Sequence, residues 1–159
     1  MRVAYENDYS LVASSVDWNR LSDVFDTDIY SLWGSNGISA ADVIQGGIGN
    51  CWLQAAAASV AQDPARIEKL FEIKTLNTAG VYALNMYVMG IPVTVSVDDH
   101  LAMYSTTADG TVFAHRSPDH GLWNLILEKA AAKLFGNFEM LSGGWMGPAV
   151  QAMTGAPFY

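Results

Sequence analysis

The chain has 159 residues, of which 51% are hydrophobic and 15% charged, and it carries a net charge of −8. This composition excludes a disordered chain and predicts one globular domain with a sizeable core. The eight lysine and arginine residues are spread along the sequence, so nucleic acids and anionic membrane surfaces are unfavourable partners. No apolar stretch is long enough to span a bilayer, whereas the apolar excess predicts a protein partner.

The first half of the chain is expected to form an N-terminal extension, an irregular packed segment and two helices. Residues 1–17 are weakly patterned and form the extension, so the folded domain is predicted over 18–159. Aromatic residues and turn formers then alternate up to residue 44. An alanine run predicts a helix over 51–62, and the Asp-Pro pair that follows it begins a second helix over 65–71.

The second half is expected to add a small antiparallel sheet. β-Branched and aromatic residues predict strands over 81–88 and 93–97. The short link of Met89 and Gly90 between them is typical of a hairpin. A further short strand is predicted over 111–114, after an Asp-Gly turn.

Two more helices complete the predicted layout. Apolar residues at helical spacing predict a helix over 122–135 that ends at Gly136 and packs on the 51–62 helix. A last short helix is predicted over 148–153. These elements together predict an α+β fold, with several helices and one small sheet.

The only cysteine, Cys51, lies at the predicted start of the 51–62 helix. Backbone N–H groups and the positive end of the helix dipole favour the thiolate there. Glycines at 46, 47 and 49 let the backbone turn sharply into this position. Gln45 lies six residues upstream, where its side-chain amide would donate to an oxyanion beside the Cys51 N–H. The two side chains therefore suit nucleophilic catalysis.

A different interpretation of Cys51 stays open. A lone cysteine is more commonly a small buried hydrophobe than a nucleophile. One unpaired cysteine excludes an internal disulfide framework and fits a reducing compartment, so a cytoplasmic or other intracellular location is expected.

Residues 45–52, with the preceding 38–43, resemble the nucleophile segment of the calpain family of cysteine proteases. Papain-like enzymes share the Gln-to-Cys spacing and the Gly-x-Cys-Trp sequence. The segment 95–99, which ends in two aspartates, and the helix over 123–136 resemble calpain elements in the same order. The resemblance covers residues 18–155, nearly the whole chain, and several motifs in order make chance agreement improbable.

The resemblance implies a fold and a role for each half of a protease core. The fold is the papain-like and calpain-like cysteine protease core, of which this chain resembles only the first lobe. That lobe is helical with a small antiparallel sheet, and it carries the catalytic Cys51 and the oxyanion-binding Gln45. The second lobe, with its catalytic His and Asn, is absent from the sequence.

The three histidines are not expected to replace the missing base. His100, His115 and His120 lie in segments that do not resemble the family's His motif, so no catalytic triad is assigned from them. Two other positions depart from the family. Asn50 stands where the family usually has Asp, and Gln54 stands where it tends to be apolar.

A calcium ion is the one cofactor that the resemblance implies. The family pattern places backbone carbonyls of Ser35 and Gly37 and the carboxylate of Asp42 on the ion. Gly121 occupies the position of a further acidic ligand, so the site should be weakened, because calcium prefers six to eight oxygen ligands. Asp119 would substitute if the loop shifts, whereas Asp42 is equally suited to a turn or cap role.

Two functions follow, and whether the chain is an enzyme stays open. In the first, it is part of a calpain-like, calcium-dependent cysteine endopeptidase that acts on polypeptides and is inactive without its His/Asn lobe. In the second, it is a non-catalytic calpain-like structural or interaction subunit of a larger assembly, whose exposed apolar face binds a partner.

Overall fold

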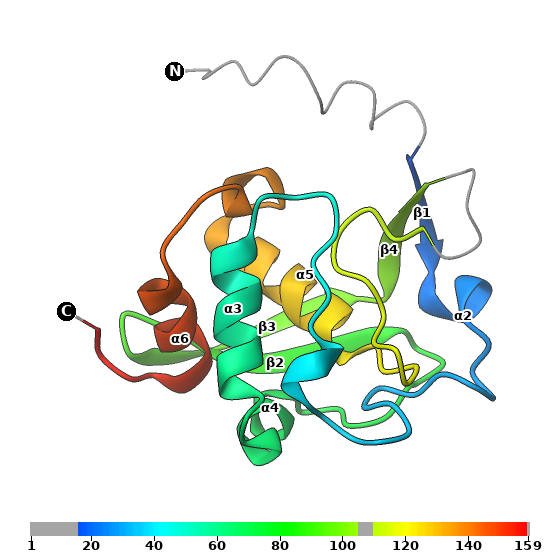
Figure 1. The fold of residues 1–159 in the computed structure, drawn as a ribbon, viewed down its shortest axis with the longest axis horizontal. Helices are drawn as coiled ribbons and strands as arrows, with labels where there is room; N and C mark the ends of the chain where they lie inside the picture. Colours follow the sequence, from blue (N-terminus) through cyan, green and yellow to red (C-terminus); the bar gives the residue numbers. More distant parts are fainter. Residues whose placement is uncertain (1–15, 105–109, 159) are drawn as a thin grey trace.

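The computed structural model describes residues 16–104 and 110–158 (Figure 1). The fold is α+β with small antiparallel sheets, as predicted. Its elements in chain order are β1 (Val16–Arg20), α2 (Leu21–Val24), η1 (Ala40–Asp42), α3 (Cys51–Val60), α4 (Pro64–Leu70), β2 (Val81–Val88), β3 (Ile91–Asp98), β4 (His100–Tyr104), α5 (Trp123–Phe135), η2 (Glu139–Leu141) and α6 (Met146–Thr154).

The predicted hairpin is confirmed as the antiparallel pair β2–β3. The pairs run from Val81 opposite Asp98 to Val88 opposite Ile91, so the second strand is longer than predicted. Successive side chains of β2 alternate between buried and more exposed positions, which gives the hairpin one core face. The two turn residues, Met89 and Gly90, both have positive φ angles of 51° and 81°. This is the backbone of a type I′ turn, whose twist matches that of the strands.

A second sheet, β1–β4, was not predicted. β1 pairs antiparallel with β4, although about eighty residues separate the paired positions. Arg20 at the end of β1 reinforces the pairing, because Nε and Nη2 donate to the two carboxylate oxygens of Asp99 at 3.0 and 3.1 Å. β1 includes Val16 and Asp17, the last two residues of the predicted extension, and residues 1–15 lie outside the described part.

The predicted strand over 111–114 is wrong. Thr111 makes only an isolated bridge to Met103, and the next bridge joins His115 to Ile44. The reason is that the backbone groups of this segment are divided between two neighbours. The Val112 N–H donates to Ala102 in β4 at 2.9 Å, whereas the Val112 carbonyl accepts the N–H of Gly47 at 2.8 Å. No continuous ladder can form on either side.

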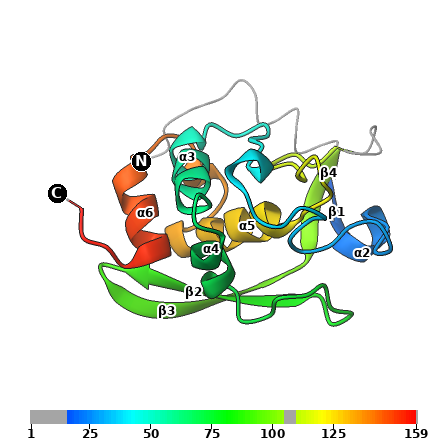
Figure 2. The ribbon, with the colours of Figure 1, turned by 60° about the horizontal axis from the view of Figure 1, so that its bottom comes forward.

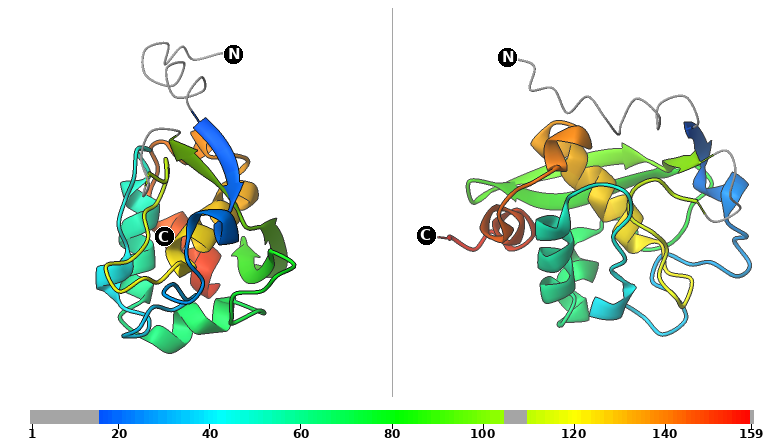
Figure 3. Two further views of the ribbon diagram at one scale, coloured as in Figure 1. Left: turned by 90° about the vertical axis from the view of Figure 1, so that its right-hand side faces the viewer. Right: turned by 45° about the horizontal axis from the view of Figure 1, so that its top comes forward.

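All four predicted helices are present, as α3, α4, α5 and α6, with ends displaced by up to two residues. Figures 2 and 3 show α5 between α3 and the β2–β3 hairpin, with α6 beside α3. The predicted contact between α5 and α3 is made partly by aromatic rings, since Trp52 meets Phe135 edge-on at 5.4 Å. The apolar face of α5 also packs on β3, so the helix is central to the core. Within the described residues, no helix is both long and apolar enough to cross a membrane.

The β2–β3 turn yields a stability prediction. Met89 is 88% exposed and holds a left-handed backbone that asparagine adopts more readily than other non-glycine residues. Met89→Asn should therefore raise the free energy of unfolding by about 0.5–1 kcal/mol. Urea denaturation would measure the change. Met89→Ala, which retains the unfavourable backbone, is the control and should leave stability nearly unchanged; an equal gain in both variants would contradict the explanation.

Candidate active site

The loop before α3 is fixed against the segment that precedes α5. Gly46 approaches Phe113 so closely that a Cβ atom would overlap the Phe113 carbonyl oxygen, so only glycine fits there. The neighbouring Gly47 N–H donates to the Val112 carbonyl at 2.8 Å. On the other side, the Gly49 carbonyl accepts the N–H of Gly143 at 2.9 Å. The loop is thus held from both sides where it enters the helix.

Cys51 is the first residue of α3 and is exposed. The next residue, Trp52, is 9% exposed and anchors the first turn in the core. Its indole N–H donates to the Leu141 carbonyl at 2.8 Å, and Gly144 lies so close that a Cβ there would overlap the ring. The anchored Trp52 therefore leaves the thiol of Cys51 at the surface, near the outward-pointing N–H groups of the helix start.

Gln45 lies at the opposite end of the same loop and is exposed. Its side-chain Nε2 donates to the carbonyl of Ile48 at 2.8 Å. A primary amide carries two N–H groups, so one remains for another acceptor. The hydrogen bond fixes the amide within the loop that ends at Cys51.

A buried polar network lies behind the first turn of α3. Glu128 of α5 is 2% exposed, and its Oε1 accepts hydrogen bonds from Asn50 Nδ2 at 2.6 Å and Gln54 Nε2 at 3.0 Å. Its Oε2 accepts the Ala114 N–H at 2.7 Å. Asn124, one turn earlier on α5, donates Nδ2 to Gln54 Oε1 at 2.9 Å. The network joins α3, α5 and the segment that contacts the nucleophile loop.

The protonation of Glu128 is set by opposing effects. Burial raises the pKa of Glu128 above its usual value, while the hydrogen bonds from Ala114, Asn50 and Gln54 act to lower it. A carboxylate can accept all three donors at once, whereas burying it without them would be unfavourable.

Sequence analysis missed Glu128 and Asn124 as site residues. Both belong to the stretch that resembles the family, but their chemistry was not considered. The available signal is spacing: the two polar residues are four positions apart, on one face of the helix and among its buried apolar residues. A polar pair on a buried helical face requires partners, and the departures at Asn50 and Gln54 supply them.

The three histidines make other contacts. His100 Nδ1 lies 3.0 Å from Asp98, and the ring of His120 meets Tyr30 at 4.9 Å. His115 Nδ1 lies 2.8 Å from the Thr111 hydroxyl, and burial, followed by the charge of Arg116, lowers the pKa of His115. Across residues 16–104 and 110–158, no histidine makes a hydrogen bond or an ion pair with Cys51.

The two carboxylates considered for calcium, Asp42 and Asp119, accept hydrogen bonds from nearby protein donors. Asp42 is buried and accepts the Ser39 N–H at 2.7 Å, the Ser39 hydroxyl at 3.1 Å and the Trp123 indole N–H at 3.0 Å. It forms the capping box of η1, the cap role that the sequence left open.

Asp119 approaches the loop that contains the other two expected ligands, Ser35 and Gly37. Its Oδ2 accepts the Asn36 N–H at 2.8 Å, and its backbone carbonyl accepts the Ser35 N–H at 3.0 Å. Burial acts to raise the pKa of Asp119, but the hydrogen bonds from Ser117 and Asn36 outweigh it, so the pKa is lowered. An ionised Asp119 therefore holds the loop of Ser35 and Gly37 in place by accepting hydrogen bonds from its backbone.

These residues do not fit a calcium site of the usual kind. Calcium requires six to eight oxygen ligands with carboxylates among them, and Gly121 has no side-chain carboxylate to offer. In the described part of the chain, no group of three or more His, Cys, Asp or Glu side chains is placed to hold a metal ion.

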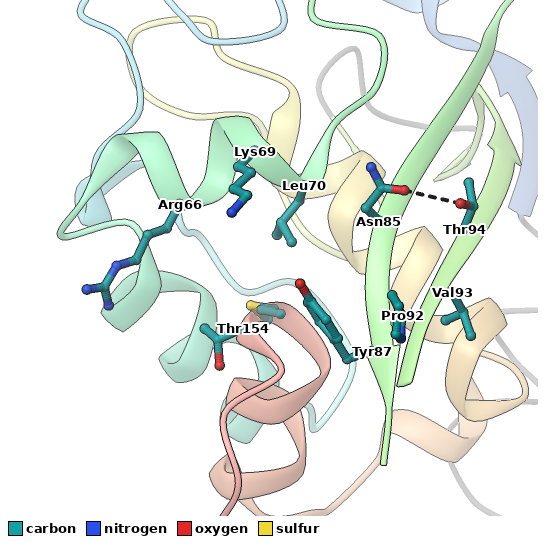
Figure 4. A pocket seen from close by; sticks show the side chains of 10 residues that line it. Arg66, Lys69, Leu70, Asn85, Tyr87, Pro92, Val93, Thr94 and Thr154 are labelled. Carbon is teal, nitrogen blue, oxygen red and sulfur yellow. Dashed lines mark hydrogen bonds between the residues drawn. The ribbon is translucent and has the colours of Figure 1, made fainter. Parts of the chain in front are cut away.

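A separate cavity lies away from the nucleophile loop. Its volume is about 580 Å³, and it opens between α4, the β2–β3 hairpin and the end of α6 (Figure 4). Figure 4 shows Lys69 and Leu70 on α4 facing Tyr87 on β2 across it. The lining residues are Arg66, Lys69, Leu70, Asn85, Tyr87, Pro92, Val93, Thr94, Met153 and Thr154. None of them belongs to the loop 45–51, so this cavity is not part of the candidate active site.

An exposed cysteine at a helix start, following a glycine-rich loop that begins with glutamine, is the arrangement that the sequence analysis linked to cysteine proteases. Residues 2–159 match the sequence model described as calpain family cysteine protease. The chain belongs to the calpain family of cysteine proteases.

Several curated relatives show the same relationship. The chain is 37% identical over 124 residues to Calpain clp-1 of Caenorhabditis elegans, covering 76% of this chain and 16% of that protein. It is 33% identical over 151 residues to the Calpain-2 catalytic subunit of Bos taurus, covering 92% of this chain and 21% of that protein. Calpain-B of Drosophila melanogaster is 33% identical over 142 residues, with 87% and 15% covered. The chain thus spans about a fifth or less of these relatives.

Calcium should have little effect on the stability of this chain. A site with a dissociation constant of about 0.1 mM would add roughly 1.8 kcal/mol at about 2 mM calcium. Because the carboxylates are engaged with protein donors, we expect the midpoint of thermal unfolding in about 2 mM calcium and in EDTA to agree within about 1 °C. Magnesium at the same concentration controls for ionic effects. A rise of several degrees that only calcium produces would disprove this expectation.

Proposed function

We propose that this chain is the nucleophile-bearing lobe of a calpain-like cysteine endopeptidase. Cys51 attacks the carbonyl carbon of a peptide bond, and Gln45 donates a hydrogen bond to the resulting oxyanion. A second lobe, on sequence other than the described residues, supplies the His that accepts the thiol proton and the Asn that orients it.

The observation that carries this proposal is the exposure of Cys51 at the start of α3 while its neighbours on both sides are buried. Asn50 is 0% exposed and Trp52 9%, so only the thiol of this turn is available to another molecule. A structural cysteine would be expected inside the core, where a small apolar side chain contributes to packing.

Gln45 has a suitable chemical group for its proposed role. One amide N–H is used to bond Ile48 at 2.8 Å, and the second is available to an oxyanion together with the Cys51 N–H. The bond to Ile48 would restrict the amide before substrate arrives, which is the preorganisation that oxyanion stabilisation requires.

The proposal takes the base from elsewhere, because His100 and His115 bond other residues and the ring of His120 packs against Tyr30. His115 is tied to the residue before Gln45, since its backbone N–H donates to the Ile44 carbonyl at 3.0 Å. Its Nδ1 faces Thr111, however, and its lowered pKa disfavours the protonated form that follows thiol deprotonation. The proposal includes no calcium ion, because the expected ligands do not fit one. A reducing, intracellular compartment suits a free nucleophilic thiol.

A second candidate function rests on the exposed apolar residues. Trp145 is 82% exposed, Met140 64% and Phe158 49%. Trp145 follows Gly144, which packs on Trp52, so this surface adjoins the nucleophile turn. A partner of a non-catalytic subunit would cover such a surface, and so would a second protease lobe.

The isolated chain should show no peptidase activity. A nucleophile without its base loses most of its catalytic power, so cleavage of a fluorogenic peptide should equal that of Cys51→Ala and of buffer. Cleavage by the chain that disappears in Cys51→Ala would refute the proposed division of the catalytic groups between lobes.

Covalent labelling tests the nucleophile itself. A thiol-directed electrophile carried on a peptide should label Cys51 faster than the same electrophile without the peptide, as judged by intact mass. Equal rates would remove the support for a peptide-binding nucleophile and favour the second candidate.

The natural form of the protein distinguishes the two candidates directly. An intact mass well above the 17.2 kDa of this chain, or a copurifying chain with a His/Asn lobe, would favour the protease. A mass of 17.2 kDa with no such companion would favour the structural or interaction subunit.

A further inference from the structure

Asn50 occupies the N-cap position of α3 and immediately precedes Cys51. Its backbone carbonyl accepts the first hydrogen bonds of the helix, from the N–H groups of Leu53 at 2.9 Å and Gln54 at 3.1 Å. Its side chain makes no cap hydrogen bond to the helix, although this is the usual role of asparagine there. Instead, Nδ2 donates to Glu128 Oε1 at 2.6 Å. The helix start is therefore tied to α5 rather than capped by its own residue.

Two segments supply every donor that the structure records on Glu128. Asn50 and Gln54 come from α3, and the Ala114 N–H comes from the segment whose neighbours Val112 and Phe113 contact the nucleophile loop. No charged side chain appears among these partners, so neutral dipoles alone stabilise the carboxylate. Such a buried group holds its partners firmly, because moving any of them leaves a polar group without a hydrogen bond.

The side chain of Asn50 leaves one of its own buried polar atoms without a hydrogen-bond partner. It is 0% exposed, and its Oδ1 is buried without a hydrogen-bond partner among the described atoms. An unsatisfied buried oxygen is unfavourable, and native proteins contain few of them. The orientation of the Asn50 side chain is therefore set by its hydrogen bond to Glu128, and not by an arrangement in which all its polar atoms have partners.

We propose that Glu128 is a positioning residue for Cys51, acting through Asn50. The buried carboxylate holds the residue that precedes the nucleophile, and so fixes the thiol relative to the N–H groups of the helix start and to the loop of Gln45. This inference rests on the proposed function, since it concerns the same thiol. The amide at position 50 suits the role: an aspartate there would set a second buried carboxyl against Glu128, and like charges at this distance would compete for one proton.

The single cysteine provides a direct test on the chain as it exists. The rate of alkylation of Cys51 by iodoacetamide at neutral pH would be measured in the native and the denatured state, with the free energy of unfolding measured alongside. The informative variants are Asn50→Ala and Gln54→Ala. Both lose one hydrogen bond to the same carboxylate oxygen, but only position 50 adjoins the nucleophile.

We expect the native chain to react faster than the denatured chain, because the fold holds the exposed Cys51 beside the outward-pointing N–H groups of the helix start. Asn50→Ala should lower the native rate by about threefold or more, towards the denatured rate. Gln54→Ala should change it by less than about twofold, although this variant also loses the hydrogen bond from Asn124. Glu128→Gln keeps the shape of the side chain but replaces one of its two acceptor oxygens by an N–H donor, so it should lower the rate by more than Gln54→Ala and by less than Asn50→Ala.

The outcomes separate the two proposals. If the native chain reacts no faster than the denatured chain, both the nucleophile role and the positioning role are overturned. If the native chain is fast but Asn50→Ala matches it, or Gln54→Ala slows it equally, only the positioning role is overturned. If Asn50→Ala does not fold, comparing Glu128→Gln with Gln54→Ala decides: a rate loss in Glu128→Gln no larger than in Gln54→Ala contradicts the proposal.

Discussion

Three segments far apart in the sequence meet at one buried carboxylate. Glu128 accepts donors from the start of α3, from its next turn and from Ala114, and it lies on the helix at the centre of the core. A buried ionisable group is tolerated only with such partners, so the geometry of all three segments is coupled. The position of Cys51 depends on this coupling, because α3 begins at the residue after Asn50.

Close backbone approach complements the carboxylate. Gly46 lies against the Phe113 carbonyl and Gly144 against the Trp52 ring, at separations that a Cβ atom would not permit. These contacts leave the loop between them little freedom, and Trp52 closes the inner side of the turn. Cys51, next to Trp52, and Trp145, next to Gly144, are both exposed.

The loops around η1 show how one sequence departure changes a local structure. Where the family pattern has an acidic ligand, Gly121 has no side chain, and Asp119 instead accepts the Asn36 N–H from the facing loop. Asp42 bonds Ser39 and Trp123. The two carboxylates that suggested a metal site in the sequence thus accept hydrogen bonds that join neighbouring segments of the protein.

The sequence by itself determined the elements whose information is local. Helical spacing located α5, the alanine run located α3, and the Met89–Gly90 link located the β2–β3 hairpin. The ordered motifs also identified the family, and Cys51 and Gln45 as its candidate residues. Only the tertiary structure decided the β1–β4 pairing, the division of residues 110–115 between two neighbours, and the network of Glu128. Their partners lie up to about ninety residues apart, and no local pattern records which distant donor will meet a buried acceptor.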